Sequence, residues 1–278
     1  TDSIVIKLDK EAIKRSGMMV PDSIPDYMSI SLKGKHLLYK SELMMLEMLA
    51  NTNWERPLYM AITVGSENQL NLTNNFLQEG LAYRITPFTH EQLGARIDSD
   101  KMYDNLMHKF KFGGIDNPDI YLDETVLRMC DTHRRMFVQL ASQLIKEGKK
   151  DKAREVLDYC EKVIPSTTVR HDYIYSSSKE MADDYITLGA YDKAEAILEA
   201  LAKDATEYAS WYLSLDDARF ANSYESCMRY FYILDDVCKS MNKIQEPGAN
   251  ETSTRGKHYR QTFEQLYKQL ESRVGSAQ

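Results

Sequence analysis

The hydrophobic positions of the first ninety residues alternate between strand-like and helix-like spacing. Apolar side chains stand at every second position in Ser3–Leu8 and in Tyr27–Leu32, which predicts two strands with one buried face each. A short helix, ending at Arg15, is expected after the first strand. Ser41 is a suitable N-cap for a further helix, which carries several leucines and methionines and ends near Asn51.

An almost unbroken apolar run, Leu58–Val64, predicts a strand that is covered on both faces. Such strands are typical of parallel sheets with helices above and below. A helix over Asn68–Gln78 and a strand over Leu81–Ile85 would continue the alternation of strands and helices. We therefore predict a small α/β layer domain over residues 1–98, with Trp54 packed against it.

From Asp100 onward the hydrophobic spacing is almost entirely helical. One helix is expected over Asp100–Phe110, and a loop rich in glycine and proline, Lys111–Asp119, follows it. This loop is the predicted domain boundary. We assign residues 99–122 to a helix and linker, and Asp123 caps the long helix that comes next.

An internal repeat follows the linker. Forty-one residues separate Gly148 from Gly189, and the same spacing relates the surrounding small and apolar positions. The arrangement is similar to the tetratricopeptide repeat, whose period is about 34 residues, so about seven residues are inserted within Ser166–Ser178. We predict two such helix pairs over residues 123–210. The shared frame is Ala141, Leu144, Gly148, Ala153, Leu157 and Cys160, matched by Ala182, Tyr185, Gly189, Ala194, Leu198 and Leu201.

Two more helices are expected over residues 211–278, where they would cap the array. The apolar seams are Phe220, Tyr224, Cys227, Phe231, Leu234, Cys238 and Met241 on the first and Tyr259, Phe263, Leu266 and Leu270 on the second. The polar linker Asn242–Arg255 joins the two helices. The predicted fold class is thus mixed, a small α/β domain followed by an all-α array similar to tetratricopeptide repeats.

Charge and composition exclude some function classes. The net charge of −7 argues against a nucleic-acid-binding surface, which would need clustered lysine and arginine. No apolar stretch approaches the roughly 18 residues that a membrane span requires. The chain begins at Thr1 rather than methionine, so we expect it to be a piece of a longer protein.

Side chains that carry chemistry show no catalytic spacing. The six histidines form no zinc-binding pair, and the acidic loop around Asp116 and Asp119 lacks the EF-hand frame, so we interpret it as a helix N-terminus. The turn Gly65–Asn68 lacks a phosphate-binding fingerprint. We therefore predict no catalytic residue, cofactor or metal. The four cysteines, which form no CxxC pair, occupy apolar helical positions and are expected to be buried: Cys130, Cys160, Cys227 and Cys238.

The repeat offers the one candidate site with a geometrical basis. In repeat arrays of this kind the first helix of each pair lines a concave groove that holds a peptide or a partner segment. The alternative is that the chain's own helices fill the groove, because fewer than three repeats rarely stand alone. The predicted groove residues are Arg135, Val138, Ser142, Ile145 and Lys146 of the first unit and Lys179, Asp183, Ile186 and Thr187 of the second.

Six segments together resemble one bacterial family. The chain is similar to the C-terminal region of multi-pass membrane proteins related to protein O-mannosyltransferases, with a GT-C-type glycosyltransferase membrane domain. The similarity covers almost the whole chain and is strongest between about residues 29 and 130. The segments are Ser29–Gly34, Leu43–Leu49, Asn53–Tyr59, Leu77–Arg84, Met102–Met107 and Asn117–Asp123.

The resemblance implies that the transferase site lies in a membrane half outside this chain, so no catalytic residue is transferred to it. It also implies a location on the periplasmic side of the inner membrane. The four unpaired cysteines favour a reducing compartment instead, but buried thiols persist without oxidation, and we follow the resemblance.

Three functions remain open. The first is a non-catalytic scaffold that binds an acceptor protein or peptide, or the parent's own membrane domain. The second is an autonomous enzyme with a small-molecule pocket at the sheet edge near Gly65. The third is a structural domain that only packs onto the membrane half of its parent.

Overall fold

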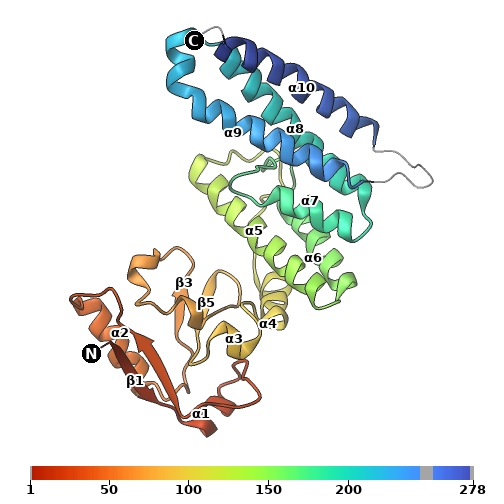
Figure 1. The fold of residues 1–278 in the computed structure, drawn as a ribbon. Helices are drawn as coiled ribbons and strands as arrows, with labels where there is room; N and C mark the ends of the chain where they lie inside the picture. The colour runs from red at the N-terminus through yellow and green to blue at the C-terminus, as the bar shows by residue number, and fades with distance from the viewer. Residues whose placement is uncertain (1, 245–252, 276–278) are drawn as a thin grey trace. The chain divides into compact units, whose positions relative to one another are not determined.

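The computed structural model describes residues 2–244 and 253–275, which fold as two compact units (Figure 1). Unit 1 is Thr1–Phe110 and unit 2 is Lys111–Gln278. The division falls directly before the predicted loop Lys111–Asp119. The helical segment that precedes the loop folds with unit 1, whereas the prediction assigned it to a separate linker over residues 99–122.

Unit 1 opens with a two-stranded antiparallel sheet. Strands β1 (Ser3–Lys7) and β2 (Tyr27–Ser31) pair over their full length, and α1 (Lys10–Arg15) lies between them in the sequence. Met28 and Ile30 are buried while their neighbours in β2 are exposed, as the alternation of the sequence requires. The two predicted strands and the short helix are confirmed.

Helix α2 (Lys40–Asn51) begins before the predicted N-cap Ser41, which lies inside it. The cap is Tyr39, whose backbone N–H donates to Glu42 Oε2 at 2.9 Å. Glu42 is buried and forms an ion pair with Lys35, which compensates the loss of its hydration. The buried glutamate therefore sets the start of this helix.

The second sheet is antiparallel, so the predicted parallel arrangement is wrong. Strand β5 (Ala82–Ile85) lies between β3 (Tyr59–Ala61) and β4 (Phe76–Gln78) and pairs with each in the antiparallel sense. Strand β3 is shorter than the predicted Leu58–Val64. Only one of its faces is covered, because Met60 is buried and both of its neighbours are exposed.

The predicted helix over Asn68–Gln78 is replaced by two short 3₁₀ turns, η1 (Ser66–Asn68) and η2 (Thr73–Asn75). Leu70 and Asn71 between them have positive φ angles of 50° and 57°, which no α-helix accommodates. Leu70 is fully buried there, and buried Asn75 donates to the Phe88 carbonyl at 3.2 Å. Core burial and asparagine side-chain bonding thus override the helical spacing.

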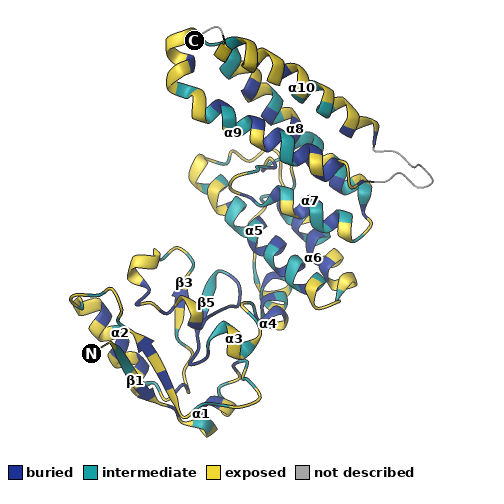
Figure 2. Cartoon of the chain, viewed as in Figure 1, coloured by how far each residue is buried: buried dark blue, intermediate teal, exposed yellow. Residues whose placement is uncertain are grey.

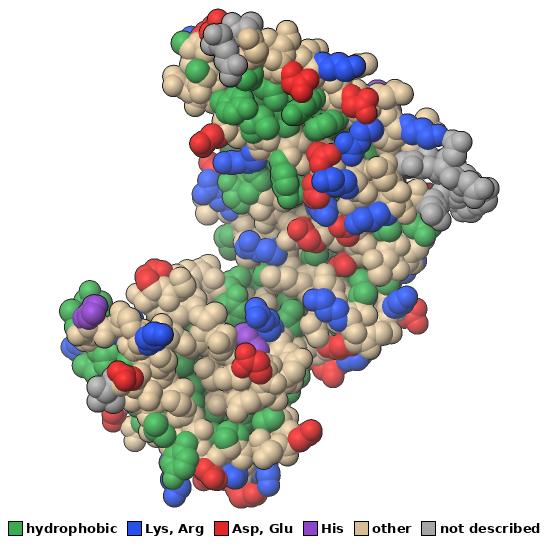
Figure 3. Space-filling model, in the orientation of Figure 1, with side chains coloured by type: hydrophobic (Ala, Val, Ile, Leu, Met, Phe, Trp, Pro, Cys, Tyr) green, Lys and Arg blue, Asp and Glu red, His purple; other side chains and the backbone are tan. Residues whose placement is uncertain are grey.

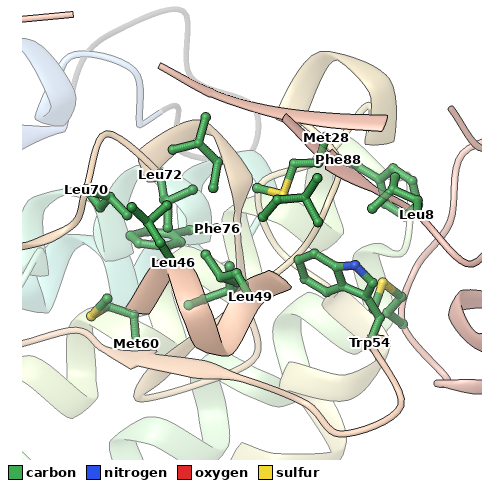
Figure 4. Close-up of a cluster of buried hydrophobic side chains, with 14 of the residues drawn as sticks. Leu8, Met28, Leu46, Leu49, Trp54, Met60, Leu70, Leu72, Phe76 and Phe88 are labelled. Carbon is green, nitrogen blue, oxygen red and sulfur yellow. The ribbon is translucent and has the colours of Figure 1, made fainter. Parts of the chain in front are cut away.

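These elements enclose one hydrophobic core, shown in Figure 4. Trp54 is 3% exposed and lies inside it, which confirms its predicted packing. Three short helical segments complete unit 1: α3 (His90–Leu93), α4 (Ser99–Asp104) and the π-helical turn η3 (Asn105–Lys109). The last two confirm the predicted helix over Asp100–Phe110, and α3 was not predicted.

Unit 2 is helical throughout its described elements. Its helices are α5 (Glu124–Lys146), α6 (Lys150–Val163), α7 (Ser178–Thr187), α8 (Tyr191–Ser214), α9 (Asp217–Met241) and α10 (Thr254–Gly275). Helix α5 packs on α6 and α7, α8 packs on α7 and α9, and α10 covers α8 and α9. Figure 2 shows buried positions on the facing sides of these helices. The predicted fold class, a small α/β region followed by a helical array, is confirmed.

The internal repeat corresponds to two matching helix hairpins, α5–α6 and α7–α8. Both turns contain glycine in the left-handed region, with φ of 77° at Gly148 and 72° at Gly189. Lys149 N–H donates to the Leu144 carbonyl at 2.8 Å, and Ala190 N–H donates to the Tyr185 carbonyl at the same distance. Each hairpin therefore turns through the same Schellman arrangement. The other ten residues of the shared frame are all buried.

The end of the second hairpin differs from the prediction. Helix α8 continues to Ser214, so the predicted boundary between residues 210 and 211 falls inside a helix. The seam on α9 is confirmed, with Tyr224 as its one exposed member, and the four cysteines are buried and free. Most of the predicted linker Asn242–Arg255 lies outside the described residues.

The glycine turns give a first prediction. Gly148→Ala should lower the free energy of unfolding by about 1 kcal/mol, because alanine is strained at positive φ. The loss should not be larger, since no neighbouring atom lies within 4 Å of the new methyl group. Gly148→Asn should cost less, since asparagine tolerates the left-handed region. Urea denaturation followed by circular dichroism measures both. Equal losses for alanine and asparagine would show that the turn is not conformationally demanding.

Candidate binding site in the helical unit

The structure places the predicted groove residues on two neighbouring helices of unit 2. Arg135, Ser142 and Lys146 lie on α5, and Lys179 and Asp183 lie on α7. Ser142 Oγ donates to Asp184 Oδ2 at 2.7 Å, which joins the two helices across the middle of the predicted groove.

The α7 side of the predicted groove is occupied by the chain's own α9. Lys179 Nζ lies 2.8 Å from Asp183 Oδ2 and 3.2 Å from Asp236 Oδ2 on α9. Ser240 Oγ, also on α9, donates to Asp183 Oδ1 at 2.7 Å. Lys179 and Asp183 therefore hold α7 against α9. Lys146 is exposed, by contrast, and Arg135 is half-buried.

The face of α5 that carries the predicted groove residues borders a cavity near the amino end of this helix. Asp131 lies one helical turn before Arg135, and Leu127 lies one turn before Asp131, so all three share a face. Asp131 and Leu127 line a cavity of about 560 Å³ whose other walls come from α8, α9 and residues 164–177, which we call the insertion loop. Its polar and aromatic lining includes Arg170, Asp172, Tyr173, Tyr175, Asp204, Tyr208, Arg229 and Tyr230.

A second cavity of about 710 Å³ lies on the other side of the insertion loop, against α6 and α8. Arg170, His171 and Asp204 line both cavities. A third hollow, lined by Arg170, Asp204, Tyr208, Trp211 and a glutamate, continues along α8. Figure 3 shows hydrophobic side chains beside both signs of charge on the face of unit 2 that carries α9. The insertion of the repeat thus creates an extended hollow surface.

The buried guanidinium of Arg134 fixes the insertion loop to α5. The side chain is 1% exposed, and its Nη1 donates to the Arg170 carbonyl at 2.9 Å. Its Nη2 donates to the carbonyls of Ile164 and Val169 at 3.1 and 2.6 Å. Backbone carbonyls without a hydrogen-bond donor are costly in the interior. Arg134 supplies donors to these three carbonyls, as the backbone N–H groups of a helix or strand would otherwise do.

Short side chains shape the rest of the insertion loop. Ser176 Oγ donates to the Asp172 carbonyl at 2.6 Å, and Asp172 Oδ1 accepts from the Ile174 N–H at 2.7 Å. His171 Nδ1 lies 3.0 Å from Ser178 Oγ. Burial, assisted by the nearby charge of Arg134, lowers the pKa of His171 to about 3. The histidine is therefore neutral at physiological pH and serves the packing of the loop.

Asp131 is the least satisfied acid in the cavity wall. Its Oδ1 is buried without a hydrogen-bond partner, and the nearest cationic atom, Arg134 Nη1, lies 3.6 Å away. Burial raises the pKa of Asp131 to about 6, against the opposing charge of Arg134. Burial also raises the pKa of Asp204, which Arg170 partly offsets.

Tyrosines form the aromatic side of the site. The rings of Tyr208 on α8 and Tyr230 on α9 are stacked, with centroids 4.6 Å apart and planes 16° apart. Tyr208 is 49% exposed, and Trp211, one turn further along α8, is 54% exposed. Exposed rings beside a cavity provide large, rigid contact surfaces for a partner.

The motif residues of unit 1 meet in a buried polar network. Glu79 is 5% exposed, its Oε2 accepts from Tyr59 at 2.6 Å, and its Oε1 lies 3.2 Å from Lys101 Nζ. Arg84 Nη2 donates to the Ser16 carbonyl at 3.0 Å. Burial, followed by the bond to Glu79, raises the pKa of Tyr59 to about 12. The network joins α1, β3, β5 and α4, so these residues hold unit 1 together.

The other predicted features of the sequence have simple structural roles. Asp123 caps α5 by accepting from the Val126 N–H at 2.8 Å, which confirms the predicted cap, whereas Asp116 and Asp119 lie in the turns before this helix and not at its N-terminus. Gly65 is exposed beside η1, and the three strands of the sheet near it pair in the antiparallel sense. Within residues 2–244 and 253–275, no cluster of three metal-ligating side chains is found. No helix in these ranges is both long and apolar enough to cross a bilayer.

Comparison with known proteins gives one family match. The family described as TMEM260-associated domain 2 matches residues 1–102, which is nearly all of unit 1. This match indicates a likeness to TMEM260-like proteins and is compatible with the expected relation to O-mannosyltransferase-like membrane proteins. No curated protein matches the chain, and neither does any solved structure.

Sequence reasoning missed two residues of α5, Asp131 in the cavity wall and Arg134 beside it, and of these Arg134 left a signal. Arg134 occupies the helical seam formed by Cys130, Phe137, Ala141 and Leu144, where a charge is expected only if it is buried with partners. The excess of the repeat period over about 34 residues located the insertion loop, but not its role.

Arg134→Met should destabilise unit 2 by about 3 kcal/mol, because three buried carbonyls lose their donor. The matched control is Arg128→Met on the same helix, whose exposed pair with Glu124 should contribute less than about 0.5 kcal/mol. Urea denaturation followed by circular dichroism measures both. Equal effects would contradict the anchoring role of Arg134.

Asp131→Asn should stabilise the protein at pH 7 by about 1–2 kcal/mol, because an ionised carboxylate is held where burial disfavours it. The folded-state pKa lies above the unfolded value of about 3.9, so wild-type stability rises as pH falls from about 6 to 4. The gap between variant and wild type should therefore close near pH 4. Exposed Asp151→Asn is the control. Thermal unfolding of the wild type and both variants from pH 4 to 7 measures these differences. An Asp131→Asn variant less stable than the wild type at pH 7 would refute the account.

Proposed function

We propose that the chain is a non-catalytic, protein-binding region of a membrane glycosyltransferase-like protein, located on the periplasmic side of the inner membrane. Unit 2 would hold an extended segment of an acceptor protein or of a neighbouring subunit. The observation that carries this proposal is the hollow surface along the insertion loop and α8.

The chemistry of this surface favours a polypeptide. A cavity of about 560 Å³ accommodates a few side chains, and its aromatic and charged lining matches the anchors found at protein interfaces. The hollows continue along α8 through shared Arg170 and Asp204, which suits a ligand longer than one residue. Arrays of helical hairpins commonly bind extended segments in this way. We propose that the two hairpins belong to the tetratricopeptide class, because their shared frame has its spacing.

The glycosyltransferase part of the proposal rests on unit 1. The family match covers residues 1–102, and the resemblance of the Asn53–Tyr59 and Leu77–Arg84 segments points to membrane proteins similar to O-mannosyltransferases. In such a protein the bond-forming site would lie in the membrane half, and this chain would present the acceptor to it.

A second function, packing onto the parent's own membrane half, is favoured by one surface of unit 1. Leu43, Met44 and Met48 on α2 are each more than half exposed, although their neighbours Leu46 and Leu49 are buried. Apolar side chains grouped on a helix surface are typical of an interface. The two functions are compatible, because they use different units.

Site-specific photocrosslinking tests the proposal in the full-length protein in its own cell. Benzoylphenylalanine at Tyr208 should crosslink to a separate polypeptide, and the same group at exposed Tyr267 on α10 should not. At Met44 it should crosslink within the parent if unit 1 packs onto the membrane half. Mass spectrometry identifies both ends of each crosslink. Equal yields of the same products from Tyr208 and Tyr267 would contradict a binding site along α8.

A further inference from the structure

The polar groups in the wall of the 560 Å³ cavity differ in how far the fold already uses them. Asp172 Oδ1 accepts from two of the insertion loop's own amides, and the nearby Arg134, which does not line the cavity, donates to three carbonyls of the loop. Asp131 Oδ1 is buried and accepts no hydrogen bond from a described residue. Its nearest cationic atom, Arg134 Nη1, lies 3.6 Å away, beyond hydrogen-bond distance, so the cavity wall has one carboxylate that the fold satisfies only in part.

Acidic and basic residues around Asp131 lie at different depths in the cavity. The Asp131 side chain is only 15% exposed, whereas Arg170 and Arg229 are exposed at the rim. Asp172 on the insertion loop and Asp204 on α8 add two further carboxylates to the lining. The Asp172 charge acts on both Asp131 and Asp204. The carboxylates of the lining thus lie deeper than its two arginines, and a buried cation near them is Arg134, 3.6 Å from Asp131 Oδ1.

Aromatic rings complete the lining on the α8 and α9 side. Tyr208 and Tyr230 form a stacked pair that borders the cavity together with Tyr175 from the insertion loop. The faces of aromatic rings attract cations, and a guanidinium also stacks on them. A buried carboxylate beside such rings is suited to a positively charged, hydrogen-bond-donating group.

We propose that this cavity receives a lysine or arginine side chain of the bound segment, with Asp131 as its acceptor. This inference rests on the proposed function, because it names the chemistry of the partner at the same site. Asp172 and Asp204 add negative charge around the incoming cation, and the Tyr208–Tyr230 pair flanks its apolar stem. The rim residues Arg170 and Arg229 select for carboxylates or carbonyls beside the basic residue.

The test compares two capped pentapeptides, acetyl-Gly-Ser-Arg-Ser-Gly-amide and its citrulline counterpart, which is neutral but nearly identical in shape. Titration of protein with ¹³C-labelled tyrosine reports binding through the ring signals of Tyr208 and Tyr230, assigned by tyrosine-to-phenylalanine substitution. The arginine peptide should bind about tenfold more tightly than the citrulline peptide, the scale of one charge-assisted hydrogen bond. Asp131→Asn should reduce this preference below about twofold, and Asp151→Asn should preserve it.

The outcomes separate this inference from the proposed function. Equal binding of both peptides at these tyrosines would overturn the role of a cation and leave protein binding in place. Absence of binding by either peptide, or ring shifts caused by methyl glycosides instead, would also overturn the inference, and the crosslinks from Tyr208 would then decide the wider proposal. Loss of folding does not confuse the result, because circular dichroism of Asp131→Asn should match that of the wild type.

Discussion

The candidate site depends on one interaction, the donation of the buried Arg134 guanidinium to three carbonyls of the insertion loop. A loop without helix or strand satisfies only some of its own backbone groups, so it would normally lie on the surface in water. Arg134 replaces that water and holds the loop against α5. The loop then forms a wall shared by two cavities instead of a solvated connection between hairpins. The insertion in the repeat is in this way the part of the unit on which the proposed binding depends.

The regular parts of unit 2 provide the frame for this loop. Matching turns at Gly148 and Gly189 set the two hairpins, and Lys179 and Asp183 join α7 to α9. The fold therefore uses much of the expected groove for its own assembly. What stays open is the amino-terminal continuation of the same α5 face, where burial raises the pKa of Asp131 to about 6 and so makes its ionised form costly. A group held at a cost in stability is typical of a functional site.

Much of the fold followed from hydrophobic spacing, because long amphipathic helices and alternating strands carry strong local signals. The repeat frame and the seam of α9 were predicted from spacing, and the cap at Asp123 from its residue type at the start of a helix. The segment Asn68–Gln78 failed, because burial of Leu70 at positive φ is a tertiary effect that periodicity does not contain. The parallel sheet failed for a related reason, since the 58–64 run is apolar but only one face of β3 is covered. At the site, spacing identified the α5 face and the insertion. The hydrogen bonds of Arg134 join residues 30 to 36 positions apart in the sequence, so they could be found only in the folded structure.

Amide hydrogen exchange along residues 164–177 tests most directly whether the insertion loop is a preformed wall. The Val169 N–H donates to the Pro165 carbonyl and the Asp172 N–H donates to Ser176 Oγ, so a loop held by Arg134 should protect both. We expect these amides to exchange at least roughly a hundredfold more slowly than in an unstructured peptide. Exchange at unstructured rates throughout the loop, with α5 and α8 still protected, would contradict the account.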